Sequence, residues 1–378
     1  MTEPTAKLGF ATKLVHAGET DNPLGSVTTP VFDTASFAMP DLAAHDRAVH
    51  DMTGVPYYTR GYNPTVHALE TKLAAVESAE AALAFNSGMA AITTTLLALA
   101  SGGGHIVASE ELFVATAKWL AEDIRALGAD CTFADFTDLA QVHKAIRPDT
   151  RVLFFEEFTN PTLRVLDLEA LIRLGHDRGL AVVVDNTFAS PALLRPTEHG
   201  ADLVVHSATK YLSGHGRVLA GSVAGRADVI EPIGELRRRL GTGVTPHNAA
   251  GVLDGMKTLE LRVDRQSASA LTLAALAAEH PATGVVHYPG LPGSHGHDIA
   301  TRLTGGRYGG MFSFTLRHPH RKAAVYNAFE VIIRATSLGD VASLVDSFDS
   351  PDLLRISVGI EDPADLTADL TAALDRGV

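Results

Sequence analysis

Cysteine, long apolar runs and excess positive charge are all scarce in this chain of 378 residues. The single cysteine, Cys131, cannot form an intrachain disulfide, which is compatible with a reducing cytoplasm. No apolar run reaches the roughly 18 residues of a membrane span, and Met1–Thr20 lacks a secretory pattern. The formal net charge of −13 disfavours nucleic acid and anionic membranes as partners. We therefore expect a cytoplasmic protein without either partner.

Metal-ligand patterns, internal repeats and low-complexity segments are missing as well. The seventeen histidines are scattered. His295 and His297 have no cysteine or carboxylate neighbours at ligand spacing, so we expect no metal. The composition that remains, 46% hydrophobic and 20% charged, is typical of a globular enzyme and argues against disorder.

Short apolar segments alternate with helical patterns through the first part of the chain. The expected strands are Ala81–Phe85, His105–Ala108, Val152–Phe155, Ala181–Val184 and Leu203–Val205. The expected helices, with apolar residues spaced by three and four, are Val66–Val76, Met89–Ala100 and Leu166–His176. Continuously apolar strands that alternate with helices predict an α/β fold with a mostly parallel sheet.

The pattern changes after about residue 246. The expected elements there are helices over Pro246–Arg262, Ser267–Glu279 and Asp365–Leu374 and strands over Gly309–Leu316 and Val331–Ala335. The first fifty residues, with several prolines, predict an extended arm. We therefore divide the chain into an N-terminal arm (1–50), a large domain (51–245) and a small α+β domain (246–378).

One segment carries an amine that can react with a carbonyl compound. In Leu203–Gly216 an apolar strand is followed by Ser207, Thr209 and Lys210 and then by a Gly/His turn. Ligands of open α/β sheets bind at the carboxyl ends of strands. At such a place the hydroxyls can donate to a phosphate and the amine can form an imine. Taken alone, the segment also fits a surface lysine after a strand.

Two further segments point to the same ligand. Asp185 ends the preceding strand, where a carboxylate can pair with a protonated pyridine nitrogen, although it can also cap a turn. Ser87, Gly88 and Met89 lie between a strand and a helix, where free backbone N–H groups bind phosphate. Together these groups suit a cofactor with a carbonyl, a pyridine ring and a phosphate.

Nine segments, in order, resemble the Cys/Met-metabolism family of pyridoxal-phosphate (PLP) enzymes. This family includes cystathionine synthases and lyases, methionine γ-lyase and acylhomoserine sulfhydrylases. The resemblance runs from about Thr28 to the C-terminus. Its segments are Tyr57–Thr65, Asn86–Ile92, Phe155–Pro161, Val183–Pro191, His206–Gly216, Gly255–Arg262, Tyr288–Pro292, Thr336–Asp340 and Arg355–Asp362.

The resemblance implies pyridoxal 5′-phosphate as cofactor and a PLP fold of type I. That fold has a large domain, with a seven-stranded, mostly parallel sheet, and a smaller α+β C-terminal domain. Lys210 is then the Schiff-base lysine and proton shuttle, Asp185 pairs with the ring nitrogen, and Asn160 lies near the ring hydroxyl. The candidates around the phosphate are Ser87, Gly88, Met89, Ser207 and Thr209.

The resemblance also implies shared active sites. Tyr58 and Arg60 correspond to a pair that reaches the phosphate of a neighbouring subunit, so a homo-oligomer, a dimer of dimers, is expected. Ser337 and Arg355 correspond to the residues that hold the carboxylate of an amino-acid substrate, a task that suits a forked guanidinium. Phe113 and Tyr58 join Lys210 as candidate catalytic residues.

Four departures from the family pattern concern the substrate side. Phe113 stands where the family has a tyrosine that stacks on the ring, so the face is kept and the hydroxyl is lost. Ala342 replaces a glutamate of the cystathionine enzymes. Arg217 follows the GHG segment, either to recruit an anion or simply as a solvated side chain. The stretch 345–354 is short and replaces a Thr-His-containing loop at the substrate entrance.

The resemblance favours a lyase or transferase that acts at the γ- or β-carbon of a sulfur amino acid or an activated homoserine. The lost hydroxyl and the rebuilt entrance favour an alternative, a specialised synthase that forms C–C or C–N bonds. A PLP-binding protein without activity is the least favoured reading, because Lys210, Asp185, Ser337 and Arg355 are all retained.

Overall fold

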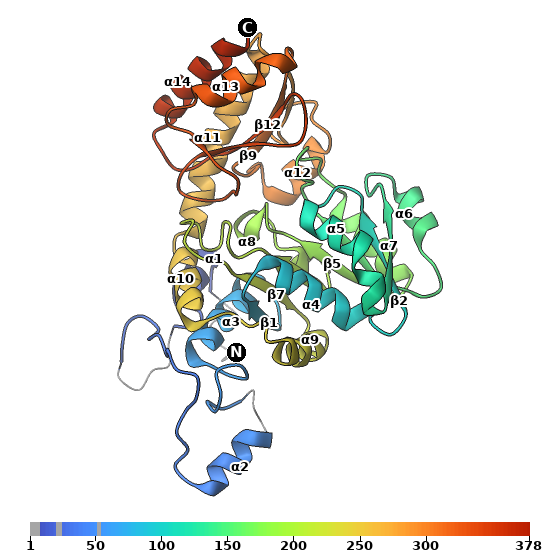
Figure 1. Cartoon of the computed structure of the whole chain (residues 1–378), viewed down its shortest axis with the longest axis vertical. Helices are drawn as coiled ribbons and strands as arrows, with labels where there is room; N and C mark the ends of the chain where they lie inside the picture. Colours follow the sequence, from blue (N-terminus) through green and yellow to red (C-terminus); the bar gives the residue numbers. More distant parts are fainter. Residues whose placement is uncertain (1–7, 20–24, 51–53) are drawn as a thin grey trace.

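The computed structural model describes residues 8–19, 25–50 and 54–378. Figure 1 shows three parts along the long axis: the N-terminal segment at one end, a large sheet covered by helices in the middle, and a small sheet with its helices at the other end. The large sheet and the small sheet give the two-part α/β architecture expected from the sequence. The domain boundaries at 50 and 245 stay a prediction.

The large sheet has seven strands in the order β1-β7-β6-β5-β4-β2-β3. Within these described strands β7 alone is antiparallel to its neighbours. The strands are β1 (Ala81–Phe85), β2 (Gly104–Ser109), β3 (Ala129–Ala134), β4 (Thr150–Glu156), β5 (Ala181–Asp185), β6 (Leu203–His206) and β7 (Gly221–Gly225). The expected seven-stranded, mostly parallel sheet is therefore confirmed.

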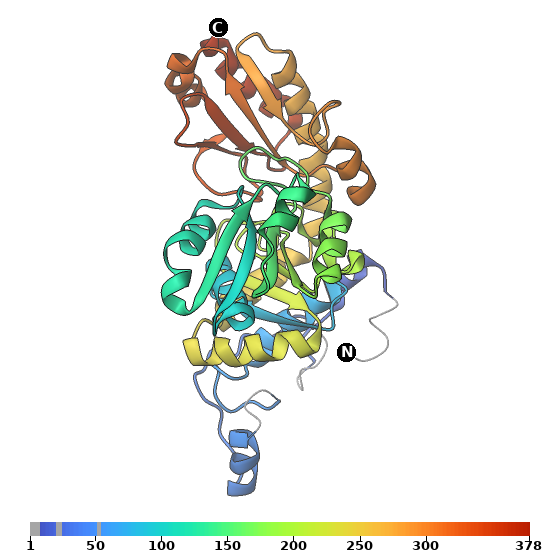
Figure 2. The same ribbon diagram turned by 90° about the vertical axis from the view of Figure 1, so that its right-hand side faces the viewer.

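Helices cover both faces of this sheet, as Figure 2 shows from the side. Successive strand residues point to opposite faces, so Phe154 packs in one core layer and Phe155 in the other. The first layer contains α4 (Gly88–Ala100), α5 (Val114–Glu122) and α9 (Ala227–Leu240). The second contains α3 (Pro64–Val76), α6 (Leu139–Ala145), α7 (Leu168–Asp177), α8 (Ser190–Leu193) and α10 (Pro246–Met256).

The small sheet has five strands in the order β10-β11-β12-β9-β8, of mixed direction. Its strands are β8 (Thr283–His287), β9 (Met311–Leu316), β10 (Ile333–Arg334), β11 (Leu344–Ser347) and β12 (Leu353–Ser357). A hydrophobic core joins it to α11 (Leu259–Glu279), α13 (Lys322–Ala328) and α14 (Pro363–Leu374). The helix α12 (His297–Thr304) packs instead on the core of the large sheet.

The expectation of one helix over Pro246–Arg262 was wrong, because a turn at Lys257 and Thr258 separates two helices, α10 and α11. The Arg262 guanidinium donates to the carbonyl of Gly255 at 2.7 Å and to that of Tyr211 at 2.9 Å. The Gly255 carbonyl also accepts from the backbone N–H of Thr258 at 3.3 Å, a tighter turn than the bond to the fourth residue onward that continues an α-helix.

Sequence reasoning missed two strands of the large sheet, the edge strand β3 and the glycine-rich β7, and three strands of the small sheet, β8, β11 and β12. Glycine disfavours strands, so Gly221–Gly225 gave no strand signal. The fold requires these glycines, because a Cβ on Gly221 would lie 2.1 Å from the Ser87 carbonyl oxygen. A Cβ on Gly225 would lie 2.2 Å from the carbonyl oxygen of Asp202.

The N-terminal segment is less extended than expected, and its residues 1–7 and 20–24 lie outside the described residues. It forms α1 (Phe10–His16) and α2 (Leu42–His50). Leu14 of α1 is buried in the core of the large sheet, and this packing stabilises a helix that the prolines elsewhere in the segment obscured. The helix α2 projects away from the body in both ribbon views.

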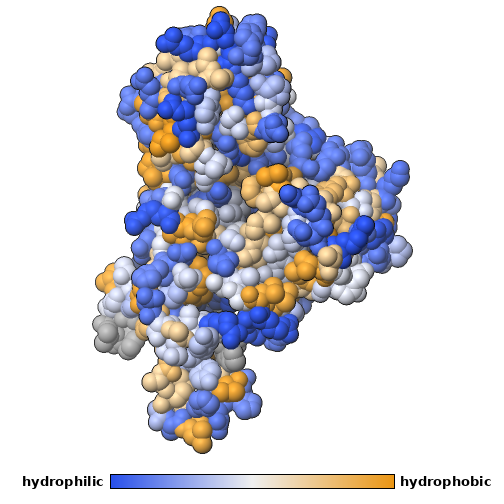
Figure 3. Space-filling view, viewed as in Figure 1, coloured by the Kyte–Doolittle hydropathy of each residue, from blue (hydrophilic) through white to orange (hydrophobic). Residues whose placement is uncertain are grey.

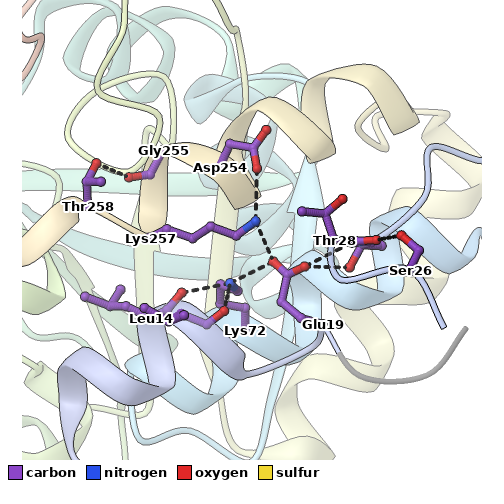
Figure 4. A network of polar contacts seen from close by, with 11 residues as sticks. Leu14, Glu19, Ser26, Thr28, Lys72, Asp254, Gly255, Lys257 and Thr258 are labelled. Carbon is purple, nitrogen blue, oxygen red and sulfur yellow. Dashed lines mark hydrogen bonds and ion pairs between the residues drawn. The ribbon is translucent and has the colours of Figure 1, made fainter.

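A buried lysine anchors this segment to the large sheet (Figure 4). Lys72 of α3 is fully buried, and its ammonium donates to Leu14 O at 2.8 Å, Val15 O at 3.3 Å and Glu19 Oε1 at 3.0 Å. Glu19 also contacts Lys257 at 3.4 Å. Burial would raise the pKa of Glu19, but the charge of Lys72 and its hydrogen bond outweigh this and lower the pKa. We call Lys72, Glu19 and Lys257 the arm anchor.

Several negative observations limit other functions. Burial raises the pKa of the Cys131 thiol to about 12, so this thiol is a poor nucleophile. None of the helices in the described part of the chain is long and apolar enough to cross a membrane. The same residues contain no group of three or more His, Cys, Asp or Glu side chains that could hold a metal ion.

Candidate active site

A cavity of about 230 Å³ lies where the carboxyl ends of β4, β5 and β6 meet the N-terminus of α4. Two segments that border the small sheet, around Ser337 and Arg355, close it from the other side. Its lining includes most of the residues singled out from the sequence: Ser87, Gly88, Met89, Phe113, Asn160, Asp185, Ser207, Thr209, Lys210, Ser337 and Arg355. Residues far apart in the sequence thus meet at the sheet edge where ligands of α/β folds bind.

Lys210 lies in the turn after β6 and projects its amine into this cavity. Its Nζ donates to Ser337 Oγ at 2.9 Å. Burial lowers the pKa of Lys210, the charge of Arg355 lowers it further, and Asp340 and Asp346 oppose the shift. A lowered pKa increases the fraction of neutral amine, which is the form that attacks a carbonyl group or takes up a proton.

Two buried carboxyl groups face each other across neighbouring strands. Glu156 and Asp185 are paired in the register of β4 and β5. Asp185 accepts hydrogen bonds from the backbone N–H of Thr187 at 3.0 Å and from its hydroxyl at 2.5 Å. The backbone N–H of Phe113 donates to Glu156 Oε1 at 2.5 Å.

Burial raises the pKa of both carboxyl groups. For Glu156 the negative charge of Asp185 adds to the effect, whereas the hydrogen bonds from Thr187 oppose it at Asp185. A cation between the two groups would stabilise their ionised forms, which burial and mutual repulsion disfavour. A protonated pyridine nitrogen is such a cation, so this part of the cavity fits the ring of pyridoxal phosphate.

The opposite end of the cavity fits a phosphate. Ser87 caps α4 and accepts from the N–H of Ala90 at 3.1 Å, while the first backbone N–H groups of the helix lie at the cavity. A Cβ on Gly88 would lie 2.8 Å from the Ser207 Cβ, so glycine is needed for this close approach. Thr209 Oγ1 exchanges hydrogen bonds with the backbone of Ala220, so its hydroxyl has to turn to reach a phosphate.

The substrate side of the cavity is built by Arg355 of β12 and by Ser337. The Arg355 guanidinium is 4% exposed and donates through Nη1 to Asn160 Oδ1 at 2.8 Å. Ser337 has a φ of 102°, a conformation that side chains rarely adopt and that clusters at functional sites. Phe113, 45% exposed, ends the loop before α5 and lines the cavity. No sequence prediction about this group of residues is contradicted.

Tyr58 and Arg60 lie outside the cavity in the single chain. They line a separate hollow of about 380 Å³, where Arg60 Nη1 donates to the Arg238 carbonyl at 3.0 Å. The Arg60 guanidinium is 5.5 Å from the centre of the Tyr58 ring. Their expected place is the cavity of a neighbouring subunit, so this prediction stays untested.

Sequence reasoning did not single out two polar residues of the cavity lining, Glu156 and Thr187, or two residues that contact Arg355, Asp346 and Phe348. Glu156 had a usable signal, since it ends an apolar strand next to the one that ends in Asp185. Asp346 contacts Arg355 at 3.2 Å, and Phe348 lies 4.8 Å from its guanidinium. No sequence pattern indicates these contacts, because they depend on how the short hairpin between β11 and β12 folds back.

Comparison with known proteins agrees with this geometry. The family of Cys/Met metabolism PLP-dependent enzymes matches residues 11–350. An L-methionine gamma-lyase from Pseudomonas putida is 38% identical, with 97% of each chain covered. A cystathionine gamma-synthase from Mycobacterium bovis is 39% identical, again with 97% of each chain covered.

A solved structure shows the same fold with the cofactor attached. It is a putative O-acetylhomoserine (thiol)-lyase from Campylobacter jejuni with N′-pyridoxyl-lysine-5′-monophosphate. Its TM-score is 0.93 at 26% identity, and the alignment covers 98% of the present chain and 100% of the other. The protein belongs to the Cys/Met metabolism family of PLP-dependent enzymes. Its cofactor is therefore pyridoxal phosphate, as expected from the sequence.

Proposed function

We propose that this enzyme catalyses elimination or replacement at the γ-carbon, or the β-carbon, of a sulfur amino acid or an activated homoserine. The single observation that carries the proposal is the cavity itself, in which Lys210, Asp185 and Arg355 converge within about 230 Å³. The amine suits a Schiff base, the buried carboxyl group suits the ring nitrogen of the cofactor, and the forked guanidinium suits the α-carboxylate of an amino-acid substrate. The methionine gamma-lyases and cystathionine gamma-synthases among its relatives support it.

Each side chain has a distinct task in this proposal. Arg355 binds the substrate carboxylate and so orients the α-hydrogen toward Lys210. Lys210, whose pKa is lowered by burial, takes the α-proton and returns protons at the neighbouring carbons. Asp185 keeps the ring nitrogen protonated, and bound pyridoxal phosphate supplies the electron-withdrawing ring that makes the α-proton acidic.

Subunit assembly belongs to the same proposal. The N-terminal part carries exposed apolar residues, and Figure 3 shows apolar patches where it projects from the body. These side chains are Val27, Val31, Leu42, Val49, Val55 and Tyr58. Burial against a second copy would remove them from water and bring Tyr58 and Arg60 to the neighbouring cavity. We propose a dimer of dimers with shared sites, in the cytoplasm.

A product assay tests the activity. The enzyme, saturated with pyridoxal phosphate, is incubated with methionine, O-acetylhomoserine or O-succinylhomoserine, each with and without a thiol. Elimination from methionine consumes water and gives methanethiol, 2-oxobutanoate and ammonia, whereas replacement gives a new thioether amino acid and the free acid. Mass spectrometry should detect one of these product sets, and none with Lys210→Ala.

The alternative is a synthase that forms C–C or C–N bonds. Two observations favour it: the ring of Phe113 has no hydroxyl to protonate a leaving group, and the connection from β11 to β12, the strand that carries Arg355, is short. A new C–C or C–N product, together with the absence of 2-oxobutanoate and of thioethers, would replace the γ-elimination or γ-replacement proposal.

A further inference from the structure

The guanidinium of Arg355 is already occupied by a carboxylate of the same chain. Asp346 and Arg355 are paired in the antiparallel register of β11 and β12, so both side chains lie on one face. Arg355 Nη2 donates to Asp346 Oδ2 at 3.2 Å and to Ser337 O at 3.5 Å. The Phe348 ring covers the guanidinium from 4.8 Å.

The pairing affects the atom that a bound carboxylate needs most. A guanidinium can take a carboxylate bidentately along the Nε–Nη2 edge or along the Nη1–Nη2 edge, and both edges use Nη2. Arg355 Nε is buried and has no hydrogen-bond partner among the described residues. On the Nε–Nη2 edge, Nη2 therefore already donates to Asp346, while Nε has no partner among the described residues.

Further hydrogen bonds hold Asp346 and its hairpin in place. Thr336 Oγ1 donates to the same Asp346 oxygen at 3.1 Å. The hairpin turn that follows Asp346 is tied to α13, because Lys322 Nζ donates to Phe348 O at 2.9 Å and to Ser350 O at 2.5 Å. Asp346 thus keeps its position when the cavity holds no substrate carboxylate.

We propose that Asp346 is a specificity-determining residue that competes with the substrate carboxylate for Arg355. This inference rests on the proposed role of Arg355 in substrate binding. An incoming carboxylate either displaces Asp346 from Nη2 or shares one guanidinium with it, and like charges at that distance repel. In both cases Asp346 weakens the binding of carboxylate-bearing ligands and leaves ligands without a carboxylate unaffected.

A purely structural role predicts the opposite sign. If Asp346 only oriented Arg355, removing it would loosen the guanidinium and weaken carboxylate binding. The sign of the change in affinity therefore separates competition from positioning.

The test is a binding titration of the holoenzyme that needs no turnover. L-Norleucine has a methylene in place of the sulfur of methionine and so lacks a leaving group, and 1-aminopentane is the same molecule without the carboxylate. Binding is followed by the change in cofactor absorbance. Asp346→Asn should lower the Kd of norleucine about tenfold, as expected for removing a charged competitor, and leave that of 1-aminopentane unchanged.

Matched variants make the result specific. Asp349→Asn removes an exposed carboxylate from the same hairpin and should change neither Kd. Asp346→Ala, a second way to remove the charge, should tighten norleucine at least as much. In an Arg355→Gln background Asp346→Asn should have no effect, because the competition acts through Arg355.

Three outcomes would overturn the inference: a norleucine Kd that is unchanged or higher in both Asp346 variants, an equal gain for 1-aminopentane, or the same gain in the Arg355→Gln background. Each is independent of the product assay. A protein without γ-elimination or γ-replacement activity would refute the proposed function and leave this measurement interpretable.

Discussion

Two regions of the molecule bury a lysine, and their surroundings differ. In the arm anchor the ammonium of Lys72 has three acceptors for its three hydrogens, one of them the Glu19 carboxylate. In the cavity Lys210 Nζ donates to Ser337 Oγ, and no described carboxylate lies within ion-pair distance of it. Burial lowers the pKa of both lysines. The neighbours differ in sign. The negative charge of Glu19 opposes the lowering at Lys72, whereas the positive charge of Arg355 lowers the pKa of Lys210 further.

The difference distinguishes a lysine that stabilises the fold from a lysine that can react. A buried charge that is fully paired is costly to break and holds two segments together. A buried amine that lacks a carboxylate partner is easily neutralised and stays available for reaction. The comparison therefore assigns Lys72 to stability and Lys210 to catalysis, and each assignment can be broken by experiment.

The largest effect is expected at Lys210. Lys210→Ala removes both the cofactor-binding amine and the group that moves protons, so activity should fall by about 1,000-fold or more. Absorbance of the bound cofactor should change as well, while the thermal unfolding temperature should stay close to that of the wild type. Steady-state kinetics, absorbance spectra and thermal unfolding measure the three quantities.

Lys144→Ala, at an exposed position on α6, is the matched control and should change none of them. If Lys210→Ala retained most of the activity, or destabilised the fold as strongly as a change at Lys72, the assignment of Lys210 to catalysis would fail.

The next effect is expected at Lys72. Lys72→Met keeps the volume but leaves the buried Glu19 carboxylate with Lys257 as its remaining cation and with the hydrogen bonds from Thr29, so the free energy of unfolding should drop by about 3 kcal/mol. Affinity for pyridoxal phosphate should be unchanged, because the arm anchor is not part of the cavity. Urea unfolding and cofactor titration measure these quantities.

Lys118→Met is the control for this change, because the Lys118 side chain is 68% exposed and its pair with Glu122 contributes little. A loss at Lys72 no larger than at Lys118 would contradict the interpretation of the anchor as a structural ion pair.

The smallest effect is expected at Phe113, which contributes an aromatic face and no charge. Phe113→Ala should weaken binding of pyridoxal phosphate by about 1 kcal/mol, the scale of an aromatic pair. Phe113→Tyr keeps the face and should retain the affinity. The measurement is the dissociation constant of the cofactor, obtained by absorbance titration. Equal constants for Phe113→Ala and the wild type would show that the ring does not stack on the cofactor.

The residues that the sequence singled out around the cofactor line one cavity, and there is a physical reason for it. Asp185, Ser207, Thr209 and Lys210 directly follow apolar strands, and parallel strands bring their carboxyl ends to one edge of the sheet. The substrate half was less accessible. Arg355 was found by resemblance, but its contact with Asp346 depends on a short hairpin whose register no local pattern reveals.

Local chemistry also explains which elements could be predicted. Strands β1, β4, β5 and β6 are continuously apolar because helices cover both faces, so each was expected close to its observed bounds. The strand β7 was missed because its glycines make room for the backbone at Ser87 and Asp202. The break between α10 and α11 was missed because apolar residues at helical spacing continue across it, while the turn is made by local backbone bonds and by Arg262, which donates to the carbonyl of Gly255.

The sequence by itself determined the α/β class, because it follows from apolar periodicity, and it determined the family, because nine short segments resemble that family in order; the roles of Lys210 and its expected partners follow from that resemblance and stay predictions. The tertiary structure alone decided which buried charges are paired. It placed Glu19 on Lys72, Asp346 on Arg355 and Glu156 beside Asp185, and among residues 8–19, 25–50 and 54–378 it put no carboxylate within ion-pair distance of Lys210. Such pairings depend on distances between segments far apart in the chain, which only the packed fold brings together.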